Sequence, residues 1–236
     1  MRKLNIPKSW DDIIVAKAIE ISSVSSSDRV SHLLSKLGVE GANKLKLEEA
    51  AEASASLKFL TELPTDNPKE ITINKKVYTR KEHSKLTLAE FIDVDVLVNR
   101  GALDNVHQLA AILFTDEKEY DIFNRRKRAE IILSAPFSQV WQPVQDLLTY
   151  RMDTFKTYEG LFGTFDDKDA EEQQTPDEYT TKWGWTTYLN VLCSDDILKH
   201  DDMLKVNHVE CLNQLAFFTE RRAYLEEKQR LKERKG

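Results

Sequence analysis

Four side chains that can ligate a metal ion lie close together near the end of the chain: Cys193, His200, His208 and Cys211. His208 and Cys211 are three residues apart in a segment with helical periodicity, so they could share one face of a helix. Zinc sites usually have closely spaced ligand pairs at both ends, and the gap between Cys193 and His200 fits no familiar class. Two semi-buried thiols and two surface imidazoles are therefore the favoured interpretation, and we expect no metal and no other cofactor.

The sequence contains no pattern that is typical of an active site. Gly-x-Ser-x-Gly, the P-loop and the Rossmann fingerprint do not occur in it. His200-Asp201-Asp202 resembles a fragment of a metal-phosphohydrolase motif. Nothing upstream supplies the other ligands, so a polar loop with an aspartate helix cap is the simpler interpretation. We expect no catalytic residues, and an enzyme whose site is assembled from scattered residues stays as an alternative.

Two basic stretches supply the candidate partner-binding residues. The first is the run Arg125, Arg126, Lys127 and Arg128, whose four cations spread round a helix rather than lining one face. No aromatic residues alternate with them, as they would in a platform that binds nucleic acid. A solvated corner is the simplest interpretation, and contact with an acidic partner or with the chain's own 166–178 segment is the alternative. The second stretch lies near the C-terminus and comprises Lys228, Arg230, Leu231 and Lys232.

The composition is that of a soluble globular protein. Of the 236 residues 31% are charged and 41% hydrophobic, and the net charge is −6, so general affinity for DNA or for anionic membranes is not expected. No apolar run approaches the roughly 18 residues of a membrane span. The N-terminal residues 1–7 lack the apolar core of a signal peptide. The two cysteines favour reduced thiols in a cytosolic protein.

The elements that would position these residues are mainly helices, with one hairpin. Two β-prone runs, 71–73 and 76–79, are separated by Asn74-Lys75, which predicts a two-residue turn. Thr87 and Glu90 have the spacing of a capping box, and Leu86 and Phe91 that of a hydrophobic staple. A helix is therefore expected from this point to about Gly101.

Apolar periodicity predicts the other helices. Their expected buried faces are Ile14, Val15, Ala18 and Ile19; Val30, Leu33, Leu34 and Leu37; Ala50, Ala51, Ser54, Leu57 and Leu60; Val106, Leu109, Ala110, Leu113 and Phe114; Tyr120, Phe123 and Ile131; and Val209, Leu212, Leu215 and Phe218. An aromatic-rich helix from about Phe137 contains Pro143, which predicts a break or kink near Trp141–Gln142. The last helix is expected to belong to the core up to about Leu225. Beyond that point it should fray, or dock on a partner's acidic groove.

We therefore predict a mainly α protein with a single short β-hairpin near residues 71–79. Its expected regions are an N-terminal helical region with the hairpin (1–114), an aromatic-rich helical region (115–163), an acidic linker or loop (164–180) and a C-terminal helical segment (181–236).

Three stretches carry a resemblance to a known group of proteins. The chain opens with Ile6-Pro7-Lys8-Ser9-Trp10, the hairpin is followed by Leu86-Thr87-Leu88-Ala89-Glu90-Phe91-Ile92-Asp93, and Trp183-Gly184-Trp185 leads to the helix at 212–218. This order resembles tail-assembly chaperones and virion-associated proteins of tailed bacteriophages, in which I-P-x-x-W/I opens the chain and L-T-L-G-x-[FY]-I-[DE] follows a hairpin. Ala89 stands where glycine is commoner, and the acidic segment is not part of that pattern.

The resemblance implies a non-enzymatic phage assembly protein that binds other phage proteins through apolar helix faces. Its expected place is the host cytoplasm, with no membrane and no direct nucleic-acid contact. A permanent virion component, such as a neck, tail or internal cargo protein, is the first alternative, and an enzyme without a recognisable motif is the second. The family has no catalytic residues to transfer to this chain, and the oligomeric state stays open.

Overall fold

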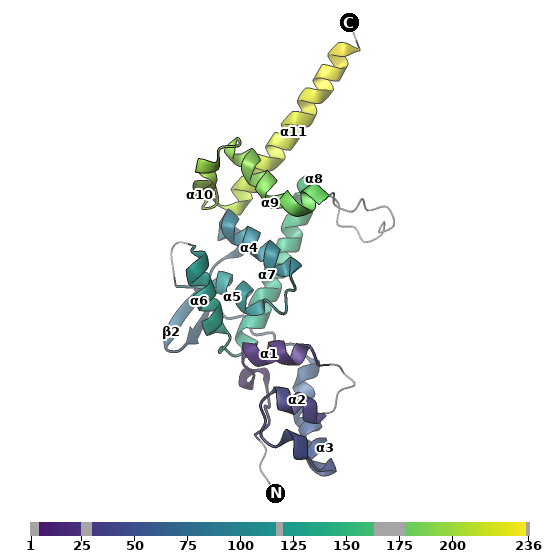
Figure 1. Ribbon diagram of the computed structural model, residues 1–236, viewed down its shortest axis with the longest axis vertical. Helices are drawn as coiled ribbons and strands as arrows, with labels where there is room; N and C mark the ends of the chain where they lie inside the picture. Colours follow the sequence, from purple (N-terminus) through teal and green to yellow (C-terminus); the bar gives the residue numbers. More distant parts are fainter. Residues whose placement is uncertain (1–4, 25–29, 117–119, 163–177, 235–236) are drawn as a thin grey trace. The chain divides into compact units, whose positions relative to one another are not determined.

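The computed structural model describes residues 5–24, 30–116, 120–162 and 178–234. It confirms a mainly α fold with one small antiparallel sheet (Figure 1). The chain forms two compact units: unit 1 is Met1–Lys81 with Val96–Leu148, and unit 2 is Glu82–Asp95 with Thr149–Gly236. The four consecutive regions expected from the sequence stay a prediction. Most of the acidic 164–180 segment falls outside the described residues, and its last residues belong to the helix α9 (Glu178–Cys193).

Unit 1 begins with short helices. These are the 3-10 helix η1 (Trp10–Asp12), α1 (Val15–Ser22), α2 (Val30–Lys36), η2 (Ala42–Lys44), α3 (Leu47–Ser56) and η3 (Leu57–Thr61). The expectation that Ile14 lies on a buried helix face is wrong. Ile14 pairs with Pro136 in an isolated β-bridge and is 38% exposed, so α1 begins one residue later.

The small core of these helices differs in detail from the expected one. Leu34, Val39, Ala42, Ala53 and Leu57 form its buried cluster. In α3 the buried alanine is Ala53, whereas the predicted Ala51 and Ser54 are exposed. Residue 53 lies one helical turn before buried Leu57, so these two positions share the inner face.

Trp10 belongs to an aromatic cluster of unit 1 that also contains Phe59, Phe137 and Trp141. Its ring centroid lies 5.7 Å from that of Phe59 and 5.0 Å from that of Phe137, and Trp141 lies 5.3 Å from Phe137. The indole N–H of Trp10 donates to the Glu62 carbonyl at 2.7 Å. The aromatic residues near 137–141 are therefore part of the packing of unit 1.

The predicted hairpin is confirmed. Strands β1 (Glu70–Ile73) and β2 (Lys76–Arg80) pair antiparallel, and Asn74 and Lys75 both have positive φ (52° and 68°), as a two-residue hairpin turn with matching twist requires. The sheet has a third strand that the sequence did not predict. β3 (Phe114–Thr115) pairs with the other edge of β2, so Phe114 follows α5 (Val106–Leu113) instead of ending it.

The capping box before α4 (Leu88–Asn99) is confirmed. The Thr87 backbone N–H donates to Glu90 Oε2 at 2.8 Å, and the Glu90 N–H donates to Thr87 Oγ1 at 3.3 Å. Leu86 and Phe91, the two residues of the predicted staple, are fully buried. The helix ends before Gly101, whose φ of 107° is a conformation that side chains with a Cβ rarely adopt.

The two helices that follow β3 both differ from expectation. In α6 (Ile122–Ile132) the buried residues are Arg125, Arg128, Ala129 and Ile132, and the predicted Phe123 is 67% exposed. Of the predicted break or kink near Trp141, the break does not occur, because α7 (Ser138–Thr157) runs through Pro143 without interruption, and the kink stays a prediction. Proline removes one backbone hydrogen bond there, and buried Val140, Val144 and Leu147 hold the helix on both sides of it.

Unit 2 contains the C-terminal helices. They are α8 (Glu159–Phe162), α9 (Glu178–Cys193), η6 (Ile197–Lys199), α10 (His200–Met203) and α11 (His208–Glu233). The core of the unit is Phe91, Phe155, Leu212 and Leu215, surrounded by partly buried aromatic residues that include Tyr150, Trp185 and Tyr188. No helix among the described residues is long and apolar enough to cross a membrane.

Removal of the Thr87 cap tests how much this cap contributes to the stability of unit 2. Thr87→Ala removes the side-chain acceptor for one helix N–H, so the free energy of unfolding should fall by about 1 kcal/mol in urea denaturation. Thr157→Ala is the matched control, because the exposed Thr157 hydroxyl only donates to the Asp153 carbonyl within α7. Equal unfolding midpoints for Thr87→Ala and wild type would refute the cap.

Candidate functional site

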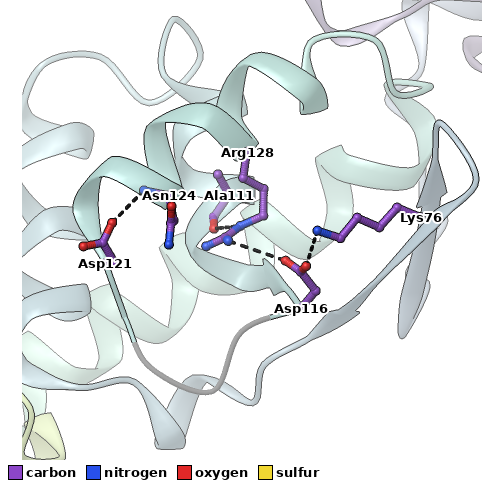
Figure 2. Close-up of polar contacts among 6 residues, drawn as sticks. All are labelled: Lys76, Ala111, Asp116, Asp121, Asn124 and Arg128. Atoms are coloured by element: carbon purple, nitrogen blue, oxygen red, sulfur yellow. Dashed lines mark hydrogen bonds and ion pairs between the residues drawn. The ribbon is translucent and has the colours of Figure 1, made fainter.

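The basic run on α6 is not the solvated corner that the sequence predicts. Arg125 and Arg128 are only 4% and 5% exposed, because residues three apart share a helix face and this face packs against α5. Arg128 Nε donates to the Ala111 carbonyl at 3.0 Å (Figure 2). Arg125 donates to Gln108 Oε1 at 3.4 Å. Arg126 is exposed, like its neighbour at 127.

Asp116 joins this buried face to the hairpin. Its carboxylate pairs with Lys76 of β2 and lies 3.8 Å from the Arg128 guanidinium, as Figure 2 shows. The hydrogen bond from Lys76 is the main cause of the lowered pKa of Asp116. At the start of α6, Asp121 Oδ1 accepts the N–H of Asn124 at 2.7 Å. The two buried arginines therefore have structural partners, and only Arg126 and Lys127 are left as candidate contacts for another protein.

The sequence contains a signal that could have identified this buried face. Residues 125, 128, 129 and 132 have the i, i+3, i+4, i+7 spacing of a buried stripe, with alanine and isoleucine at the last two positions. Because arginine usually lies at the protein surface, the residue types at positions 125 and 128 did not predict a buried stripe.

The metal-ligand candidates do not form a site. Cys193 and Cys211 are buried free thiols, and Cys211 Sγ lies 3.8 Å from Met203 Sδ. Burial raises the pKa of Cys211 to about 11 and also raises the pKa of Cys193, so both disfavour the thiolate that ligates metals or attacks substrates. Within the ranges that the structure describes, no group of three or more His, Cys, Asp or Glu side chains could hold a metal ion.

His208 is a structural residue, and its interpretation as a surface imidazole is wrong. It is fully buried, and its ring stacks on Phe91 with centroids 4.6 Å apart. Nδ1 lies 2.8 Å from the Leu86 carbonyl, which can only accept, so Nδ1 carries the proton. Nε2 then accepts from the Tyr150 hydroxyl at 3.0 Å.

The start of α11 is fixed to the segment before α4 by backbone hydrogen bonds as well. The His208 N–H donates to Leu86 at 3.1 Å, the Leu88 N–H to Val206 at 2.8 Å and the Ala89 N–H to Leu204 at 3.0 Å. Asn207 caps the helix by accepting the Val209 N–H at 2.9 Å. The first turn of α11 is therefore held in one position on unit 2.

A buried carboxylate ties three helices of unit 2 together. Asp95 of α4 accepts from Arg151 of α7 through both Nε, at 3.0 Å, and Nη2. Its other oxygen, Oδ2, accepts from the indole N–H of Trp185 in α9 at 2.7 Å. Arg151 also lies over the Phe155 ring, 4.6 Å from its centroid. These side chains satisfy one another inside the unit, so the group is a structural network.

The second half of α11 is an exposed surface. Burial ends earlier than the sequence predicts: Leu215 is the last buried residue, and Tyr224 and Leu225 are 64% and 51% exposed. Every residue from Thr219 to Arg234 is exposed, and Figure 1 shows this half of the helix extending beyond α9 and α10. The candidate residues at 228, 230, 231 and 232 all lie on it.

Comparisons with protein-family models, with curated proteins and with solved structures found no match for this chain.

The Asp95 network predicts a large loss of stability when its cation is removed. Arg151→Met should lower the free energy of unfolding by about 3 kcal/mol, because the buried carboxylate then lacks the guanidinium. The double variant Asp95→Asn/Arg151→Met should recover part of this loss, since the charge is gone too. Urea denaturation of the four proteins in this cycle tests the pair, and strictly additive losses would contradict it.

The burial of His208 predicts that the stability of unit 2 falls at acidic pH. Burial lowers the pKa of His208 in the folded protein, and the Leu86 carbonyl and the charge of Glu90 oppose that shift. The unfolded chain takes up the proton near pH 6.5. The stability that the neutral ring contributes is therefore present above about pH 7 and is lost as the pH falls through 6.5.

The thermal midpoint should therefore fall more steeply between about pH 7.5 and 5.5 in wild type than in His208→Gln. His32→Gln, at an exposed position in unit 1, is the control and should keep the wild-type slope. Burial also lowers the pKa of His107. His107 is present in wild type and in both variants, so it contributes equally to all three slopes. Parallel slopes for wild type and His208→Gln would show that His208 does not cause the acid sensitivity.

Proposed function

We propose that the protein is a non-enzymatic assembly protein of a tailed bacteriophage, of the tail-assembly-chaperone type, which binds other phage proteins through an apolar helix face. The observation that carries the proposal is the exposed second half of α11. Tyr224, Leu225 and Leu231 are 64%, 51% and 47% exposed there, on a helix whose first turns are buried in unit 2.

An exposed helix of this kind is expensive for a protein to keep ordered by itself. From Glu226 to the C-terminus the one apolar residue is Leu231, and burying a leucine contributes roughly 2 kcal/mol. Ordering about ten residues costs on the order of 10 kcal/mol, which helix hydrogen bonds offset only in part. A partner that covers the helix would supply the missing stabilisation, as in the common binding mode in which a helix lies in a groove.

The chemistry of the polar groups supports a binding role rather than catalysis. Three buried ones, at His208, Asp95 and Arg128, are engaged in hydrogen bonds that hold helices together. The two thiols have raised pKa values. The phage assignment rests on the resemblance of the three sequence stretches given above, and it is the part that experiment has to test first.

The rival role as a permanent virion component makes a different prediction for the particle. An assembly factor should be missing from purified virions of the encoding phage, whereas a neck, tail or cargo protein should be present in them. Mass spectrometry of purified particles separates the two roles, and a constant number of copies per virion would replace the proposal by its rival.

Deleting Lys228–Gly236 should leave the thermal midpoint within error, because every described residue of this stretch is exposed. The same deletion should weaken the capture of phage proteins from lysates of infected cells, measured by affinity purification and mass spectrometry. A truncated protein that unfolds would show that the tail belongs to the core, and undiminished capture would show that partners bind elsewhere.

A further inference from the structure

We infer that the partner presents an acidic and apolar helix to one defined face of α11. This face consists of Phe217, Arg221, Tyr224, Lys228 and Leu231, and we name it the tail face. The inference rests on the proposed function and adds to it the location of the binding surface and the chemistry of the protein that would cover it.

The tail face is continuous along the helix axis. Phe217, Tyr224 and Leu231 are seven residues apart, a spacing that drifts only about 20° per step round an α-helix. Their exposed fractions are 54%, 64% and 47%. Arg221 and Lys228 each follow an aromatic residue by four positions, which places them in the same line. Lys228 Nζ lies 5.8 Å from the centroid of the Tyr224 ring.

The tail face points away from the side that anchors the helix. The anchored side of α11 consists of the buried residues His208, Cys211, Leu212 and Leu215. Beyond Leu215 this side becomes polar, because helical periodicity continues it through residues 222, 226, 229 and 233. Arg222 pairs with Glu226 at 3.0 Å, and Gln229 donates to Glu233 at 3.1 Å. Since that side ends in polar pairs, an apolar partner would bind the opposite side.

The charges on the tail face specify the chemistry of the occupant. Arg221 and Lys228 lie between the apolar residues, and Lys232 follows Lys228 by one turn. Glu226 and Glu233 lie on the anchored side, and Glu220 and Glu227 border one edge of the tail face, so the charges within the line itself are both positive. A partner that covers the apolar side chains must also supply carboxylates for the cations, since a buried unpaired charge is costly. A helix with apolar residues every seven positions and Asp or Glu between them meets both needs.

The same arrangement argues against two other occupants. A helix that lies on a membrane keeps its cations on the polar side, whereas Arg221 and Lys228 would enter the acyl region together with the apolar residues. For a single-stranded nucleic acid, Phe217 and Tyr224 are about 10 Å apart along the axis, too far to stack on successive bases.

The test uses the full chain and fluorescent helical peptides of about three heptads. The acidic probe has Leu at positions a and d and Glu at e and g, and the basic probe has Lys in place of Glu. Fluorescence anisotropy should show the acidic probe binding at least about tenfold more tightly than the basic probe, with an affinity that falls as salt is added. Tyr224→Ala should weaken binding of the acidic probe.

Charge reversal on the helix supplies the matched comparison. Arg221→Glu/Lys228→Glu should invert the preference of the protein for the two probes. Arg222→Glu/Arg234→Glu, which makes the same change in charge off the tail face, should keep the wild-type preference within about twofold. Circular dichroism and thermal midpoints verify that all variants stay folded, as the exposure of the four positions leads us to expect.

Several results would overturn the inference. They are equal binding of the two probes, no binding of either, an unchanged preference in Arg221→Glu/Lys228→Glu, and tighter binding to phosphatidylglycerol vesicles or to a single-stranded oligonucleotide than to the acidic probe.

Failure of the proposed function looks different. In that case the probes behave as expected but no phage protein is captured from infected cells. If phage proteins are captured and the tail-face variant captures them equally well, the tail face is wrong and the function stands.

Discussion

The carbonyl oxygen of Leu86 accepts two hydrogen bonds from one residue, and the arrangement of unit 2 depends on them. The backbone N–H and Nδ1 of His208 both donate to it, at 3.1 and 2.8 Å. This carbonyl comes directly before the Thr87 capping box, so a single short segment fixes the beginnings of both α4 and α11. A neutral, fully buried imidazole is what allows this junction to form without an unpaired charge.

The anchoring of α11 at one end gives the helix two separate roles. Its first turns contribute Leu212 and Leu215 to the core of unit 2, and its remaining turns are exposed. Because the anchored side ends in polar pairs beyond Leu215, we expect changes on the tail face to leave the core intact. Under the proposed function, stability and partner binding could therefore be altered independently of each other.

Buried charges serve the architecture in both units. In unit 2, Asp95 accepts hydrogen bonds from Arg151 and Trp185 and so joins α4, α7 and α9. In unit 1, Arg128 joins α6 to the end of α5 and to Asp116. Buried polar groups of this kind stabilise a fold only when all members find partners. Such groups therefore hold the fold together, and the proposed function is assigned instead to exposed residues of α11.

The sequence by itself determined two local features, the hairpin turn and the capping box. The positive φ at Asn74 and Lys75 and the capping box at Thr87 and Glu90 depend on residues within a few positions of each other, so their spacing was enough to predict them.

Only the tertiary structure decided which polar residues are buried. His208 finds its acceptor 122 residues earlier in the chain, at Leu86, and Arg128 finds its acceptor 17 residues earlier, at Ala111. The pairing of β3 with β2 joins Thr115 to Thr79 in the same way. The free energy of burying a polar group depends on whether a partner is present at the site. Folding brings these partners together from distant parts of the chain, and a local pattern of residue types does not contain that information.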